Sequence, residues 1–139
     1  MYDVIKGWPG EGCLDVTYPA DKEKMIDEDT KLPIREGIMV TVNADGKVVP
    51  ATPSDTTLQG WLLGREMLTD MCTVLLGDYV LEMDKDHYDD TATFTPGAKV
   101  GAMGDGSGKI AAGGSGVAFG RVLSVNATTG KIVIVAGCC

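Results

Sequence analysis

Turn signals divide this chain into many short segments, and this feature restricts its fold more than any other. The 139 residues include 19 glycines, whereas average usage of about 7% would give about ten. Asp-Gly pairs at residues 45–46 and 105–106 and a Pro-Gly pair at 96–97 supply the backbone conformations that tight turns need. The segments between the turns are rich in valine and threonine. This pattern predicts an all-β protein with short strands.

The expected strands lie between these turn signals. They are residues 38–42, 47–51, 61–67, 73–76, 79–83, 120–125 and 131–135, with one more candidate at 14–18. A helix fits only around residues 58–68, where Gly60 and Gly64 disfavour it. Because open strand edges promote aggregation, such strands must close on each other or pack face to face. We therefore expect a small β-barrel or a β-tulip or sandwich.

The first 35 residues differ from the rest of the chain. They contain Pro9, Pro19 and Pro33 and a charged run at residues 21–29. Proline cannot donate a hydrogen bond to a strand ladder, so this region is a poor central strand. We predict an extended N-terminal arm at residues 1–35 and a β-barrel or sandwich body at residues 36–139. The alternative is an ordinary ordered segment that wraps on the domain.

Two parts of the body show the same order of elements. A Gly-led strand, an Asp-Gly turn, a Lys-led strand and a Gly-x-x-x-Gly-Arg strand occur in residues 37–65 and again in residues 97–121. The spacing between the copies is not constant, because the Asp-Gly turns begin at positions 45 and 105 and the Gly-Arg pairs at positions 64 and 120. One explanation is a duplicated β unit whose loops differ in length. The other is that unrelated hairpins look alike because they share turn chemistry.

The stretch from residue 97 to residue 120 is unusually poor in side chains. It holds nine glycines, separated largely by alanine and serine. Ordering such a segment costs much conformational entropy. We expect either a mobile surface loop or a segment that a neighbouring subunit orders.

Charge and hydropathy exclude several kinds of partner. The 12 Lys and Arg residues against 20 Asp and Glu give a net charge of −8, which disfavours binding to nucleic acid and to anionic membranes. No apolar run approaches the roughly 18 to 20 residues of a membrane-spanning helix, and the N-terminus does not have the pattern of a secretory signal. The four cysteines form no CxxC pair, so a reduced, intracellular protein is expected.

Two segments invite a chemical interpretation. Residues 104–109 are glycine-rich and end in Gly108-Lys109, but Ile110 stands where a phosphate-binding loop needs Ser or Thr. Residues 84–90 contain four aspartates, but Tyr88 occupies a ligand position of a calcium loop. We expect a hairpin loop in the first case. In the second, a solvated turn is expected and a cation site of another type is the alternative.

Catalysis has little support in the sequence. His87 is the only histidine, so any triad would have to use it, and no nucleophile lies beside it in the sequence. We predict that the chain is not an enzyme and has no catalytic residue, no cofactor-binding residue and no metal ligand.

The body resembles the capsid decoration (cement) proteins of tailed double-stranded DNA bacteriophages. The similar stretches are VTVNADGKVVPA at residues 40–51, GWLLGR at 60–65, FTPGAKV at 94–100 and GRVLSV at 120–125, in a short acidic chain. The resemblance implies a small β-barrel or β-tulip-like fold that sits on the outer capsid as an oligomer. It also implies that no residue is catalytic.

The resemblance implies that the chain is a structural virion protein, which stabilises contacts between capsomers of the major capsid protein. Its partners would be the major capsid protein and copies of itself in a dimer or trimer, with no nucleic acid and no membrane. It would be made in the host cytoplasm and reside on the capsid surface. Other classes stay open: another virion component (a tail-tube, adaptor or fibre-base protein), or a cellular β-barrel binding module or enzyme.

The predicted arm would grip the capsid through its large apolar side chains. An extended segment makes many contacts per residue, and buried aromatic side chains tend to carry interface energy. The expected anchors are Tyr2, Trp8, Leu14 and Tyr18.

Overall fold

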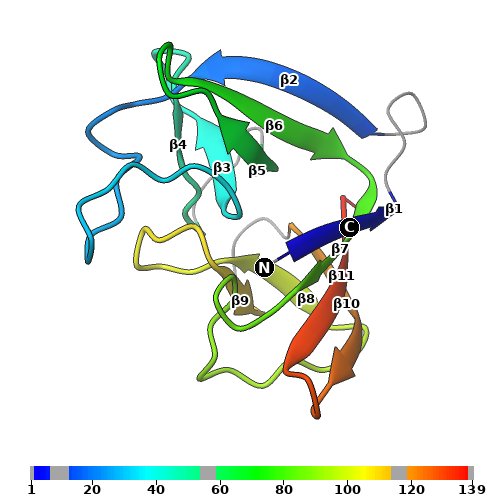
Figure 1. Cartoon of the computed structure of the whole chain (residues 1–139). Helices are drawn as coiled ribbons and strands as arrows, with labels where there is room; N and C mark the ends of the chain where they lie inside the picture. Colours follow the sequence, from blue (N-terminus) through cyan, green and yellow to red (C-terminus); the bar gives the residue numbers. More distant parts are fainter. Residues whose placement is uncertain (1, 7–12, 54–58, 114–118, 138–139) are drawn as a thin grey trace.

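The computed structural model of this protein describes residues 2–6, 13–53, 59–113 and 119–137, and all the regular elements in these ranges are strands (Figure 1). In chain order they are β1 (Tyr2–Lys6), β2 (Cys13–Pro19), β3 (Met39–Val42), β4 (Val48–Pro50), β5 (Gln59–Arg65), β6 (Met71–Gly77), β7 (Tyr79–Met83), β8 (Lys99–Ala102), β9 (Ile110–Ala112), β10 (Gly120–Asn126) and β11 (Lys131–Ala136). The prediction of an all-β protein is confirmed. Within these ranges no helix has the length and hydropathy needed to cross a bilayer.

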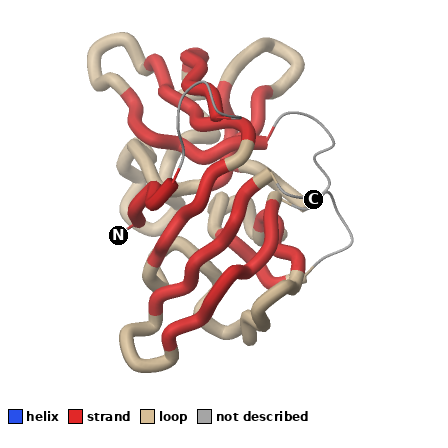
Figure 2. The backbone as a smooth tube through the Cα atoms, turned by 90° about the vertical axis from the view of Figure 1, so that its right-hand side faces the viewer, coloured by secondary structure: helices blue, strands red, loops and turns tan. Residues whose placement is uncertain are grey.

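The strands form two antiparallel sheets, one above the other in Figures 1 and 2. The first sheet has the order β2-β6-β5-β3-β4, and the second has the order β1-β7-β11-β10-β8-β9. Neither closes into a barrel, which leaves the sandwich as the better description of the two predicted forms. Each sheet nevertheless bends back on itself, because single parallel bridges join Ala20 to Val48 and Tyr88 to Ile110.

The two sheets repeat the same topology. The order β2-β6-β5-β3-β4 becomes β7-β11-β10-β8-β9, so residues 13–77 form a first repeat and residues 79–137 a second, with β1 as an added edge strand. Registers also agree, since Val40 pairs with Gly60 and Val100 pairs with Gly120. This agreement favours a duplicated unit over unrelated hairpins with similar turns.

The structure corrects how the two repeats align. The sequence pattern matched Gly64 with Gly120, whereas the registers place Gly120 opposite Val100 as Gly60 lies opposite Val40. Gly60 is therefore the true counterpart of Gly120, and we call this correspondence the register alignment. Under it, the β-bulge between Leu62 and Gly64 recurs between Val122 and Ser124. The Gly-x-x-x-Gly-Arg motif has only three fixed residues, too few to fix an alignment that the strand pairing decides.

Close backbone approach explains why both repeats need glycine here. A Cβ atom on Gly60 would lie 2.8 Å from the carbonyl oxygen of Leu75, and one on Gly120 would overlap the carbonyl oxygen of Val135. Glycine lets the neighbouring strand approach without this clash. In the segment where a helix is the alternative, residues 59–65 form β5 instead.

Each repeat surrounds its own apolar core. The buried positions of the first repeat include Val40, Val48, Leu62 and Val74, and the matching positions of the second are Val100, Ile110, Val122 and Ile134. These side chains alternate along the strands, as a sheet with one apolar face requires.

The repeats pack asymmetrically. On the opposite face of the first sheet, Met39, Trp61 and Leu75 are buried and belong to the core cluster of the second repeat. Trp61 is fully buried, and its ring centroid lies 5.3 Å from that of Tyr2 and 6.4 Å from that of Phe119. The first repeat therefore uses its outer face to dock on the second.

The described residues of the predicted arm are built into the sheets. β1 pairs with β7, and β2 pairs with β6 over seven positions without a bulge. Met25 has no exposed surface, and its carbonyl oxygen accepts a hydrogen bond of 2.9 Å from Arg65 Nη1. The first repeat thus begins before residue 36.

The glycine-rich stretch is also more regular than expected. β8 and β9 lie within it and pair with each other, and β8 pairs with β10 of the same chain. The backbone N–H of Met39 donates a 2.7 Å hydrogen bond to the carbonyl oxygen of Gly108. The described part of this stretch is ordered by its own chain, so neither a mobile loop nor a neighbouring subunit is needed to account for it.

Candidate functional site

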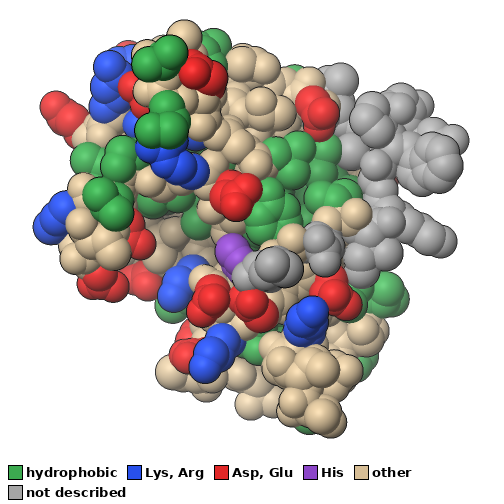
Figure 3. All heavy atoms as spheres, viewed as in Figure 1, with side chains coloured by type: hydrophobic (Ala, Val, Ile, Leu, Met, Phe, Trp, Pro, Cys, Tyr) green, Lys and Arg blue, Asp and Glu red, His purple; other side chains and the backbone are tan. Residues whose placement is uncertain are grey.

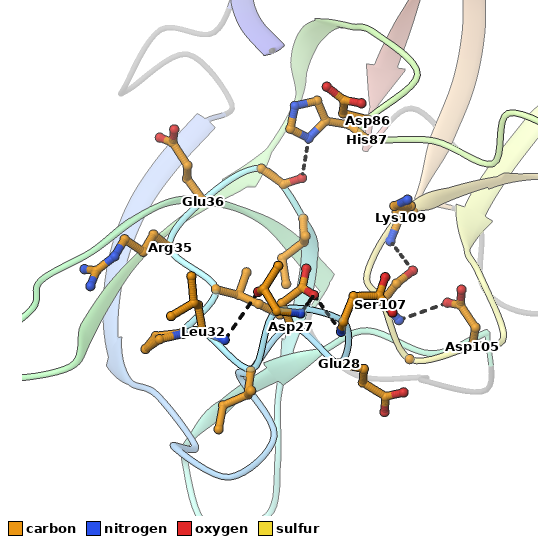
Figure 4. Close-up of a pocket in the computed structure, with 18 residues that line it drawn as sticks. Asp27, Glu28, Leu32, Arg35, Glu36, Asp86, His87, Asp105, Ser107 and Lys109 are labelled. Carbon is orange, nitrogen blue, oxygen red and sulfur yellow. Dashed lines mark hydrogen bonds between the residues drawn. The ribbon is translucent and has the colours of Figure 1, made fainter.

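A polar groove of about 580 Å³ lies where the two repeats meet (Figure 4). One wall comes from residues 26–38 of the first repeat, and the other comes from residues 86–87 and 105–109 of the second. The charged side chains along it are Asp27, Glu28, Asp29, Arg35, Glu36, Asp86, Asp105 and Lys109. Carboxylates outnumber cations, so the groove has a negative field that favours cationic groups.

Asp27 shapes the wall from the first repeat. Its Oδ1 accepts backbone hydrogen bonds from Asp29 at 2.9 Å and from Thr30 at 3.1 Å. The bonds from Thr30 and Asp29 lower the pKa of the Asp27 carboxyl, because they favour its charged form. This carboxylate stabilises a turn and is a fixed negative charge at neutral pH.

The loop between β8 and β9 forms the opposite wall. The N–H of Ser107 donates to Asp105 Oδ1 at 2.9 Å, and the N–H of Lys109 donates to the Ser107 hydroxyl at 3.2 Å. The Ser107 side chain, as the largest of several causes, lowers the pKa of Asp105. These bonds close a hairpin turn, as the sequence predicted for the glycine-rich residues 104–109.

His87 joins the two repeats at the end of the groove. Its Nδ1 lies 2.8 Å from the carbonyl oxygen of Gly37, which can only accept, so Nδ1 carries the proton. Its ring contacts those of Tyr2 and Trp61 edge to face. Figure 3 shows this side chain at the surface between acidic groups. The contacts assign His87 a structural role.

The aspartates of residues 84–90 take part in local turns. Asp84 Oδ1 accepts from the N–H of Asp86 at 3.0 Å, and Asp89 Oδ1 accepts from the N–H and hydroxyl of Thr91. Among the described residues, no three His, Cys, Asp or Glu side chains are grouped as a metal site would need. These local hydrogen bonds are those of a turn, the first of the two expectations for this segment.

The predicted anchors lie in different surroundings. Tyr2 is half-buried against the core of the second repeat, and its hydroxyl donates to the carbonyl oxygen of Leu63 at 3.3 Å. Tyr18 is half-buried against the core of the first repeat. Leu14 belongs to β2, opposite Leu76, and Trp8 lies outside the described residues. Tyr2 and Tyr18 thus pack on different core clusters.

Sequence reasoning missed a pair of exposed apolar residues at the tip of the β5–β6 hairpin. Met67 is 69% exposed and Leu68 is 92% exposed. Under the register alignment, the matching positions of the β10–β11 hairpin are Ala127 and Thr128. The pair could have been identified from the sequence by comparing the two repeats in this alignment. We call Met67 and Leu68 the apolar tip.

Cys72 is the described cysteine with a buried thiol. Burial raises its pKa, which keeps the thiol protonated and unreactive. Cys138 and Cys139 lie outside the described residues.

Comparisons of the chain with protein-family models, curated proteins and solved structures gave no match.

Proposed function

We propose that this chain is a structural virion protein that binds the outer surface of a phage capsid and stabilises contacts between capsomers of the major capsid protein. The sequence resemblance supplies the identity of the partner. The apolar tip is the observation that supports a binding role, because Met67 and Leu68 expose apolar surface at adjacent positions. Exposed apolar residues that gather at one place mark protein–protein contacts.

The second repeat acts as an internal control for this interpretation. Both hairpin turns have the same bond, from the N–H of Asp70 to the carbonyl oxygen of Glu66 and from that of Gly130 to that of Asn126, each 2.9 Å. The second turn forms with Ala127 and Thr128 at its tip. The turn therefore does not require large apolar side chains, and the exposed Met67 and Leu68 are available to contact a partner.

Hydrogen bonds also fix the backbone of the tip. The Glu66 carboxylate accepts bonds from the N–H of Leu68 at 3.2 Å, from the N–H of Thr69 at 2.7 Å and from the Thr69 hydroxyl at 2.6 Å. A rigid contact loses little conformational entropy on binding. The apolar tip lies at the top of the molecule in Figure 1, and the β10–β11 turn lies at the bottom.

Exchanging the tips tests the proposal. The double variant Met67→Ala, Leu68→Thr gives the first hairpin the residues of the second, so the fold is expected to be unchanged. Its cosedimentation is measured with empty capsids assembled from the major capsid protein whose gene lies nearest to its own. We expect binding at least tenfold weaker, since burying each apolar side chain contributes about 1.5–3 kcal/mol.

The matched control changes the other tip. Ala127→Ser, Thr128→Ser alters two exposed residues of the second hairpin and is expected to bind like the wild type. The proposal fails if the wild-type protein does not bind the capsids. A tip-exchanged variant that binds at full occupancy would show that the contact lies elsewhere.

A further inference from the structure

The outer edge of β2 is the longest open strand edge in the described structure. The edge strands are β2 and β4 in the first sheet and β1 and β9 in the second. β4 and β9 have three residues each, and β1 has a bulge between Val4 and Lys6. β2 has seven residues in continuous register with β6. Within the residues that the structure describes, no strand pairs with the other side of residues 13–19, and β4 reaches that side only beyond β2, where Ala20 bridges Val48.

The second repeat shows that this position accepts a strand. β7 is the counterpart of β2, and its corresponding edge is covered by β1. In that pairing Tyr2 lies opposite Met83 and Val4 opposite Leu81. The positions on β2 that match Met83 and Leu81 are Tyr18 and Val16, judged by their partners on β6 and β11 in the register alignment. The first repeat lacks the covering strand that the second has.

Two hydrogen bonds establish which groups of β2 face outward. The N–H of Ala20 donates to Asp70, on the β6 side, and the N–H of Asp21 donates to Val48, on the open side. Because these directions alternate along a strand, the N–H groups of Asp15 and Thr17 point to the open edge. The side chains of Asp15 and Thr17 are exposed.

β2 also has few of the features that protect natural edges. Lysine, inward-pointing charge, bulges and central proline block strand addition. Its sequence, CLDVTYP, contains no lysine, its register has no bulge, and its one proline is the last residue. Asp15 is its single charge.

We propose that two copies of this chain pair antiparallel through the β2 edge, with Val16 opposite Val16 of the second copy. The backbone N–H and C=O groups that point to the open edge belong to odd-numbered residues. Hydrogen bonds between the copies therefore require odd-numbered residues to lie opposite odd-numbered ones, which also places even-numbered residues such as Val16 opposite even-numbered ones. The register centred on Val16 overlaps the whole strand and places each Asp15 opposite Thr17, which can donate a hydrogen bond to it. Centring on Asp15 would oppose two carboxylates, which destabilises strand pairs. The register centred on Val16 therefore gives the longest overlap of the two edges without opposing like charges.

Charge changes at residue 17 test both the surface and the register. The dimer constant of the full-length protein is measured by sedimentation equilibrium with reductant present. Thr17→Asp places two like-charge pairs across the interface and is expected to weaken the dimer about five- to thirtyfold. Thr17→Lys places an ammonium opposite each Asp15 and is expected to tighten it by a similar factor. Both substitutions lie at an exposed position and should leave the melting temperature nearly unchanged.

Thr128→Asp and Thr128→Lys are the matched controls, because they alter the net charge equally at an exposed turn away from the edge. They should leave the dimer constant unchanged. A wild-type protein that stays monomeric at all concentrations overturns the proposal, as does a dimer that responds equally to changes at residues 17 and 128. The measurement uses no capsids, so its outcome is independent of the proposed function.

Discussion

Asp70 and Gly130 occupy the same turn position in the matching hairpins of the two repeats, and both have a left-handed backbone, with φ angles of 58° and 72°. Glycine adopts this conformation without strain, and aspartate does so at a cost. Asp70 is retained where glycine would be easier because its Oδ1 accepts 2.9 Å and 2.8 Å contacts from Arg65 Nε and Nη2.

Asp70→Gly should therefore lower the melting temperature despite relieving the backbone. The Arg65 side chain is 3% exposed, and without Asp70 its buried charge would lose its counter-ion. Asp70→Asn separates the loss of the ion pair from the relief of backbone strain, because asparagine removes the charge but also tolerates the left-handed region. A melting temperature that rises in Asp70→Gly, followed by circular dichroism, would mean that strain outweighs the ion pair.

Arg65→Met should destabilise the fold by about 2–4 kcal/mol, since the charge-assisted hydrogen bonds of a buried side chain are lost and Asp70 loses its arginine partner. Arg65 Nη1 donates to the carbonyl oxygens of Met25 and Ile34 and so joins β5 to the segment after β2. Urea unfolding measures the change. Arg121→Met is the control: its exposed side chain donates to Gly97, and an effect within about 0.5 kcal/mol is expected.

Acid should destabilise the protein through its turn carboxylates. Hydrogen bonds from Arg65 to Asp70 and from Thr69 to Glu66 lower the pKa of each carboxyl below the ordinary values of 3.8 and 4.5. A depressed folded-state pKa contributes stability above the unfolded value, and this is lost as pH falls through the folded value. The melting temperature should be flat near neutral pH and fall below about pH 4. Asp70→Asn should show a shallower fall, and an equal slope in the variant would contradict the assignment.

Gly120→Ala should destabilise the second repeat by about 2–4 kcal/mol, because a methyl group would overlap the backbone of β11 and force the strands apart. Gly64→Ala is the matched control, since a Cβ atom there meets nothing within 4 Å. Thermal unfolding of the two variants should differ clearly. Similar losses in both would mean that the close approach of β10 and β11 is not what requires glycine.

Trp61→Ala should cost about 3–5 kcal/mol, as expected for a buried tryptophan, and should loosen the contact between the repeats. Trp61 is the side chain that contacts Tyr2, His87 and Phe119. Hydrogen exchange should speed up most at β1 and in the segment around His87. A loss of protection confined to β5 would indicate that Trp61 does not couple the repeats.

Local turn chemistry could be predicted from the sequence, and long-range pairing could not. Asp45-Gly46 and the strands beside it were predicted because a tight turn needs a left-handed glycine, and Gly46 has a φ angle of 77°. By contrast, nothing local in residues 2–6 shows that they pair with β7, since the partner is set by tertiary packing. The prolines near β2 favour an arm when only the sequence is considered, yet Pro19 is simply the last residue of the strand.

The candidate site was harder to predict than the fold. His87 and the aspartates around it were singled out for their chemistry, but their hydrogen bonds to Gly37 and to nearby backbone groups are known only from the structure. Met67 and Leu68 gave no signal on their own, because a short apolar run resembles the end of a buried strand. Only their exposure, compared with Ala127 and Thr128, separates them from core residues.

The asymmetric docking of the repeats leaves their corresponding outer faces with different side chains. Where the first repeat presents Met39 and Trp61 to its neighbour, the second presents the exposed side chains of Lys99 and Arg121. A third unit that docked in the same way would bury these two cations, which costs free energy unless each finds a partner. Replacing both with apolar residues would remove that cost and would enlarge the apolar surface that Leu123 already exposes on this repeat.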